Sequence, residues 1–282
     1  MIMVVVQGYA DDSRQDGRTW VVAGYAAAVT QWQFFEPAWA TMLARHGVPY
    51  FHKREMGSPT GVYAKWHPPK EHQTEMDAFH ADIVKVIHGH SLLPFFSVVR
   101  TDDLDRFNAE NDLSLEPYPL AAFGCALSLA SRLRPYLGPK GTAEIVFDRV
   151  EKVSSKLAKA KQYAKRDSHH RDAFDTVTPT PPPKNVTAKE LTPLQAADFL
   201  VWELQKFHLT VADDWYRLRD KPKDYGQRWI HKDQWSLQKY GTKTPPARKS
   251  LTALAGGTSP AGMIWDYDNL KKVHQLRDGV WS

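Results

Sequence analysis

The stretch Val4-Val5-Val6-Gln7-Gly8-Tyr9-Ala10-Asp11-Asp12 runs from a β-branched segment directly into two carboxylates. Consecutive β-branched residues in a short apolar run are typical of a buried strand. The polar residues 11–17 predict a turn, and residues 20–26 predict a second strand. We therefore expect a β-hairpin whose first strand ends at acidic side chains.

Helix and strand patterns alternate beyond this hairpin. We expect helices over about residues 32–46, 71–87, 119–136 and 151–166, and strands over residues 50–52, 92–99 and 142–147. The proline-rich residues 178–183 predict a stiff connector, and Thr192-Pro193 predicts the start of another helix, with Thr192 as its N-cap. This order predicts an α/β fold in which helices flank a mixed sheet. Ligands of such sheets bind at the carboxyl ends of the strands.

Length and composition narrow the domain organisation. The 282 residues are 42% hydrophobic and 12% aromatic, which is enough for a substantial core. We expect one domain over residues 1–207 and a C-terminal aromatic and basic extension over residues 208–282 that packs on it. The single cysteine, Cys125, excludes an internal disulfide framework and lies in an apolar run, where a packing role is expected.

The chain carries no sign of membrane insertion or export. No segment approaches the roughly 20 apolar residues that span a bilayer, and no basic region precedes the first apolar run. We expect a cytoplasmic protein. The net charge of +5 modestly favours polyanionic partners such as nucleic acid. Nothing in the sequence identifies a protein partner.

Three aspartates stand at positions that favour a shared site. Asp198 lies in a predicted helix between Leu194 and Val201, which share its apolar face. Burying a carboxylate there is costly unless a cation, hydrogen-bond donors or water reach it, although pairing with a local Lys or Arg is an alternative. Asp148 follows a predicted strand, as Asp11 does, and side-chain alternation favours Asp11 over Asp12.

Clustered carboxylates are the ligands that Mg²⁺ and Mn²⁺ prefer. Two such ions about 3.5–4 Å apart can promote hydrolysis of a phosphodiester. We therefore expect Asp11, Asp148 and Asp198 to bind Mg²⁺ or Mn²⁺ and to act in catalysis.

Four segments resemble a known bacterial family, domain of unknown function 3800. They are Tyr9-Ala10-Asp11-Asp12-Ser13, Tyr50-Phe51-His52-Lys53-Arg54-Glu55, Ile145-Val146-Phe147-Asp148 and Leu194-Gln195-Ala196-Ala197-Asp198-Phe199-Leu200. The resemblance covers about residues 4–207 and implies a ribonuclease H-like fold with the matched aspartates as metal ligands. Two residues depart from the pattern: Asp12 replaces Glu, and Arg14 replaces Gly. Ribonuclease H-like enzymes usually carry a further acidic residue. Glu55 is our candidate for it, and Glu36 is the alternative.

Basic residues near these segments are candidates for substrate binding. Lys152, Lys156 and Lys159 repeat at helical spacing and would hold a phosphate backbone or form a solvated helix face. Lys53 is a candidate phosphate contact. The histidines at positions 67, 72, 169 and 170 lack a compact zinc-ligand spacing. The aromatic residues at positions 215, 225, 229, 235 and 240 would pack a subdomain or stack on single-stranded bases.

These patterns lead to one principal hypothesis and two alternatives. The principal hypothesis is a Mg²⁺- or Mn²⁺-dependent nuclease or phosphodiesterase, with Glu55 assisting the three aspartates. The first alternative is a catalytically silent module of the same fold that binds nucleic acid. The second is a protein-interaction component.

Overall fold

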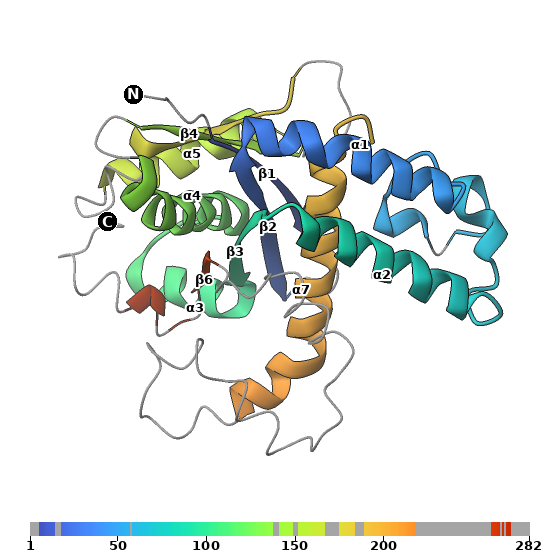
Figure 1. The fold of residues 1–282 in the computed structure, drawn as a ribbon. Coiled ribbons are helices and arrows are strands. Elements are labelled where there is room, and N and C mark those ends of the chain that lie inside the picture. Colours follow the sequence, from blue (N-terminus) through green and yellow to red (C-terminus); the bar gives the residue numbers. More distant parts are fainter. Residues whose placement is uncertain are drawn as a thin grey trace.

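The computed structural model describes residues 6–14, 18–56, 58–137, 141–148, 152–166, 175–183, 189–217, 261–265, 267 and 269–271. Its strands form a six-stranded mixed sheet, and helices cover both faces (Figure 1). In chain order the elements are β1 (Val6–Ser13), β2 (Thr19–Ala28), α1 (Val29–Arg45), η1 (Lys53–Glu55), η2 (Gly61–Trp66), α2 (Gln73–Gly89), β3 (Leu93–Arg100), α3 (Thr101–Asn111), α4 (Pro117–Leu137), β4 (Ala143–Phe147), α5 (Val153–Arg166), β5 (Val177–Thr180), α7 (Thr192–Arg217) and β6 (Ala261–Trp265). The prediction of an α/β fold with a mixed sheet is confirmed.

The sheet is ordered β5-β4-β1-β2-β3-β6. Strands β1, β2 and β3 form an antiparallel meander, as the predicted hairpin requires. Strand β4 pairs parallel with β1, and β5 pairs parallel with β4. Strand β1 therefore has an antiparallel neighbour on one side and a parallel neighbour on the other.

Two hydrophobic cores lie on opposite faces of the sheet. The first core packs α4 and α5 against residues such as Val6, Ala10 and Val22. The second packs α7 and α1 against the other face, including Val21, Ala23 and Tyr25, and extends to α2, which packs on α1. Figure 1 shows α4 and α5 on one side of the strands and α7 on the other. The arrangement is a three-layer α/β/α sandwich.

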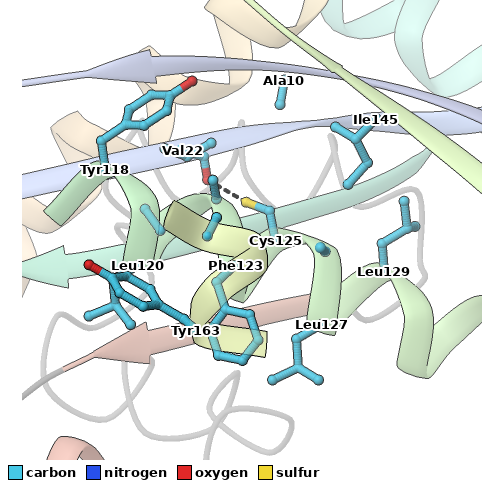
Figure 2. Close-up of a cluster of buried hydrophobic side chains, with 14 of the residues drawn as sticks. Ala10, Val22, Tyr118, Leu120, Phe123, Cys125, Leu127, Leu129, Ile145 and Tyr163 are labelled. Carbon is cyan, nitrogen blue, oxygen red and sulfur yellow. Dashed lines mark hydrogen bonds between the residues drawn. The ribbon is translucent and has the colours of Figure 1, made fainter. Parts of the chain in front are cut away.

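Cys125 has the packing role that its apolar surroundings predict. Its side chain is fully buried in the first core, and its thiol donates to the carbonyl oxygen of Val22 at 3.4 Å (Figure 2). Burial raises the pKa of the thiol well above its usual value. The thiolate that a nucleophile requires is therefore disfavoured.

Two local predictions are wrong, and one helix was not predicted. Residues 177–180 form an edge strand rather than only a connector, because Pro179 is tolerated on a strand that has no second neighbour among the described residues. Residues 50–52 form no strand and lead into η1. Helix α3 was not predicted, since of its apolar side chains only Leu104 and Phe107 are buried.

The C-terminal segment contributes a strand to the same sheet. Strand β6 pairs parallel with β3, and the indole of Trp265 donates to the hydroxyl of Ser97 at 3.1 Å. Helix α7 itself continues to Arg217. In the part of the chain that the structure describes, no helix is both long enough and apolar enough to span a membrane.

Gly124 allows the close packing of α4 on β3 and β6. A Cβ at this position would overlap the hydroxyl of Ser97 and the indole nitrogen of Trp265. We expect Gly124→Ala to lower the free energy of unfolding by about 1–3 kcal/mol, the usual cost of overpacking. Gly89→Ala is the control, because its Cβ would meet nothing within 4 Å. Chemical denaturation of both variants tests this prediction, and equal stabilities would contradict it.

Candidate functional site

The parallel pairing of β1 with β4 brings Asp11 beside Asp148. The paired residues end at Ala10 and Phe147, and the N–H of Asp148 donates to the carbonyl oxygen of Ala10 at 2.8 Å. Asp11 and Asp148 are the next residues of the two strands. The prediction that Asp11 follows the end of its strand is wrong, because β1 continues to Ser13 in the hairpin with β2. It stands instead where β1 loses its parallel neighbour.

Asp11 and Asp12 point to opposite faces of the sheet. Val6 and Ala10 belong to the α4 core, whereas Tyr9 packs against the α7 core. Because side chains alternate along a strand, Asp12 lies on the α4 side and Asp11 on the α7 side. Asp11 therefore points to the face of the sheet that is covered by α7, the helix that carries Asp198.

Asp198 is a largely buried carboxylate on α7. Its neighbours Leu194 and Val201 are buried on the same side of the helix. One carboxylate oxygen accepts the main-chain N–H of Lys53 at 2.7 Å. The predicted alternative was a pair with a local Lys or Arg side chain, and the structure instead shows this main-chain hydrogen bond.

The aspartates interact electrostatically across the end of the sheet. Burial raises the pKa of Asp11 well above its usual range, and the charges of Asp198, Asp148 and Asp12 raise it further. Burial also raises the pKa of Asp198, although the Lys53 N–H and the charge of His52 oppose the rise. Like charges that raise one another's pKa must lie close together. The three predicted aspartates therefore lie within electrostatic range of one another, and Asp12 interacts with Asp11 and Asp148.

Asp12 is balanced by groups on its own face. Burial, followed by the charge of Asp148, raises its pKa to about 6. The charge of Lys156 and the indole N–H of Trp20 act in the opposite direction. That N–H makes no hydrogen bond of normal geometry to a described residue. Lys156 is therefore the lysine of the predicted stripe whose charge lowers the pKa of Asp12.

The other two lysines of the stripe differ from Lys156. Lys159 forms an ion pair with Glu116. Lys152 lies before α5, where its carbonyl oxygen accepts the N–H of Lys156 at 3.0 Å. The ammonium of Lys159 is therefore paired within the protein, and phosphate binding by the stripe stays a prediction.

Lys53 contributes to the site through both its main chain and its side chain. Its ammonium lies 3.6 Å from the centre of the Trp202 ring and 3.3 Å from Nε2 of His80. Its positive charge also lowers the pKa of Asp198. Lys53 therefore lies at the edge of the acidic cluster, and its role as a phosphate contact stays a prediction.

Glu55 belongs to an adjoining polar network. Its carboxylate contacts Lys189 at 2.6 Å, the Tyr50 hydroxyl at 2.6 Å and Nδ1 of His52 at 3.0 Å. Burial raises the pKa of Glu55, but these hydrogen bonds outweigh burial and lower it to about 2. The connection to Asp198 runs through His52, and a direct catalytic role for Glu55 stays a prediction. The alternative, Glu36, is exposed on α1.

Gln195 is an organising residue that our sequence reasoning missed. Its side-chain oxygen accepts the N–H of Phe51 at 2.8 Å and the indole N–H of Trp39 at 3.0 Å. Its amide nitrogen donates to the carbonyl oxygen of Lys189 at 2.8 Å. Gln195 and Asp198 lie one turn apart on α7 and together hold the main chain of residues 51–53. A glutamine at a buried position of the helix was the available signal.

The donor chemistry suits a hard divalent ion, but the oxygens do not converge. Four carboxylates, from positions 11, 12, 148 and 198, lie within electrostatic range of one another. Among the residues that the structure describes, however, no three His, Cys, Asp or Glu side chains form a group that could hold a metal ion. The predicted histidines 169 and 170, and the aromatic residues at 225, 229, 235 and 240, lie outside the described residues.

Comparisons with known proteins identify no family for this chain. No protein-family model matches it. No curated protein matches it significantly either. The case for a function therefore rests on the residues themselves.

The raised pKa of Asp12 predicts a pH-dependent stability. The folded chain holds this proton up to about pH 6, whereas an ordinary aspartate releases it near 3.8. The stabilisation is fully present below about pH 4 and is lost as the pH rises through 6. A shift of this size corresponds to about 3 kcal/mol. With a chelator present, we expect Asp12→Asn to flatten the fall in stability over this range.

Thermal unfolding between about pH 4 and 7 tests this prediction. Asp82→Asn is a control of opposite sign, because a hydrogen bond from His46, assisted by Arg45, lowers the pKa of Asp82. Asp82→Asn removes this stabilisation, so we expect the variant to unfold at a lower temperature than the wild type at neutral pH. Identical pH profiles for wild type and Asp12→Asn would contradict the prediction.

Removal of Gln195 tests its organising role. Gln195→Leu leaves the buried N–H groups of Phe51 and Trp39 without their acceptor. We expect a loss of about 1–3 kcal/mol for each such group. Gln73→Leu is the control, since Gln73 is exposed and its amide nitrogen donates to the exposed Asp77. Denaturant titration measures both variants, and a Gln195→Leu protein as stable as this control would exclude the role.

Proposed function

We propose that the chain is a Mg²⁺- or Mn²⁺-dependent phosphodiesterase or nuclease that uses Asp11, Asp148 and Asp198. The observation that carries this proposal is the register of β1 with β4, which places the half-buried Asp11 and Asp148 side by side, on the face of the sheet that α7 and Asp198 cover. A protein gains no stability from burying like charges together. A cation bound among them would offset that repulsion, which makes divalent-ion binding a reason for the arrangement.

The polar surroundings of Asp198 support the same proposal. One carboxylate oxygen of Asp198 accepts a hydrogen bond from the main-chain N–H of Lys53. This hydrogen bond orients the group from outside the cluster, as an outer partner of a metal ligand does. Convergence of the oxygens on one ion would require rotation of the aspartate side chains.

The chemistry follows from the charges of this site. A bound divalent ion would supply the positive charge that stabilises negative charge developing on a phosphodiester oxygen. Asp11, Asp148 and Asp198 would hold it. Lys53 and Lys156 would draw the phosphate toward the carboxylates and neutralise part of its charge. Glu55 would fix the orientation of the His52 ring through Nδ1, beside Asp198.

We also propose that the fold is ribonuclease H-like. In support, the chain forms an antiparallel meander of three strands, and β4 and β5 extend the sheet in parallel beside β1. The motif resemblance concerns segments on β1, at the end of β4 and on α7. These are the segments that carry the coupled aspartates.

A second function is a nucleic-acid-binding module without catalysis. The observation that favours it is that no three potential ligands converge among the described residues. It differs from the first function in one measurable respect. Its affinity for nucleic acid would be unaffected by a chelator, and no cleavage would occur.

Isothermal titration calorimetry with Mg²⁺ and Mn²⁺ tests the metal site. We expect wild-type protein to bind, and Asp198→Asn to weaken binding about tenfold or more, as loss of a ligand charge does. Asparagine keeps an oxygen for the N–H of Lys53, so the fold is preserved. Asp77→Asn removes an exposed carboxylate on α2 and serves as the matched control.

Cleavage of labelled single- and double-stranded oligonucleotides tests the activity with the same proteins. Metal-dependent cleavage by wild type and Asp77→Asn, with none by Asp198→Asn, is the expected result. Equal metal affinity and equal cleavage in wild type and Asp198→Asn would exclude the proposed function. A calorimetric titration with metal in the presence of oligonucleotide detects an ion that binds only together with substrate.

A further inference from the structure

A group of cations and aromatic rings lies next to Asp12 on the α4 side of the sheet. We define the Trp20 cluster as Arg14, Trp20, Tyr118 and Lys156. The guanidinium of Arg14 lies 5.3 Å from the centre of the Trp20 ring. The ammonium of Lys156 lies 5.9 Å from that ring and 5.2 Å from the ring of Tyr118. The two rings meet edge to face at 6.0 Å.

The sheet and two helices bring these residues together. Ser13 pairs with Val21 at the end of the hairpin, and Arg14 follows β1 there, where its guanidinium reaches the ring of Trp20. Arg14 is the first residue after β1 and lies two residues after Asp12. Tyr118 comes from the first turn of α4, and Lys156 from the first turn of α5.

The rings hold the two cations in place without using their hydrogen-bond donors. A cation above an aromatic ring is attracted by the ring electrons, and its N–H groups can still donate to an anion. The contrast is Lys159 on the same helix, whose ammonium is bound to Glu116. Arg14 is exposed and Lys156 is half-buried, so an anion can approach from solvent.

We propose that Arg14 and Lys156, positioned by Trp20 and Tyr118, bind a phosphate group of a polynucleotide strand beside the carboxylate cluster. This rests on the proposed function, because the cluster of aspartates makes a phosphodiester the substrate. An acidic site repels a polyanion unless cations lie close to it. Arg14 and Lys156 supply two such charges on the Asp12 face, and the partly exposed ring of Trp20 offers an edge for an unstacked base.

Fluorescence anisotropy with end-labelled oligonucleotides, in the presence of a chelator, tests this site without metal. Single-stranded DNA, single-stranded RNA and duplex DNA are the probes. We expect Arg14→Ala and Lys156→Ala each to weaken binding about fivefold or more and to reduce the salt slope by about 0.7 for a single strand. Lys161→Ala is the control, because it removes the same charge from an exposed position of α5.

The role of the ring is tested by two substitutions of Trp20. Trp20→Leu carries no charge change, yet it removes the face that holds both cations, so binding weakens. Trp20→Phe restores an aromatic face and recovers most of the affinity. Circular dichroism confirms that both variants fold. Equal losses in Trp20→Leu and Trp20→Phe would contradict the positioning role.

The outcomes separate this inference from the proposed function. If Lys156→Ala weakens oligonucleotide binding while calorimetry finds no metal site, the phosphate site stands and the nuclease proposal fails. If metal is bound but Lys156→Ala binds each probe as Lys161→Ala does, the phosphate site is wrong. Absence of binding to all three probes by the wild-type protein would also overturn it. The probe whose affinity changes most identifies the strand type.

Discussion

The position of β1 between an antiparallel and a parallel neighbour is the constraint on which the site depends. The hairpin with β2 carries β1 past the last residue of β4, so Asp11 remains in a strand while Asp148 has left one. Side-chain alternation then sends Asp11 toward α7 and Asp12 toward α4. A shift of one residue in this register would exchange the two carboxylates and place the hydrophobic residues of β1 on the wrong faces.

Helix α7 depends on this strand in turn, because its buried residues cover the face toward which Asp11 points. Gln195 and Asp198 bind the main chain at Phe51 and Lys53, which attaches a segment without regular strand or α-helix to the sheet. The same two residues therefore fix the protein architecture and one wall of the acidic cluster.

Much of the layered fold could be predicted from the sequence, because apolar periodicity reports burial directly. The predicted strand at residues 92–99 and the helix that begins near Thr192 correspond closely to β3 and α7. Helix α3 was missed because its sequence is mostly polar, and β5 because its proline lies at an edge. The three aspartates could be proposed because they interrupt apolar patterns.

Other parts of the site give no such local signal. The ion pairs of Glu55 with Lys189 and of Lys159 with Glu116 join residues far apart in the chain. Spacing alone therefore could not distinguish Lys156, which lies by Asp12, from the other lysines of its helix. The contact of Arg14 with Trp20 depended on the register of the hairpin, which was not predicted.

The place of β6 in the sheet has a consequence for synthesis of the chain. Residues 261–265 pair with β3, which is formed from residues 93–100. During translation the outer edge of β3 therefore remains exposed until nearly all of the described chain has left the ribosome. Unpaired strand edges promote association between chains. The opposite edge of the sheet carries Pro179, which protects it, so the edge of β3 is the one that waits for its partner strand during synthesis.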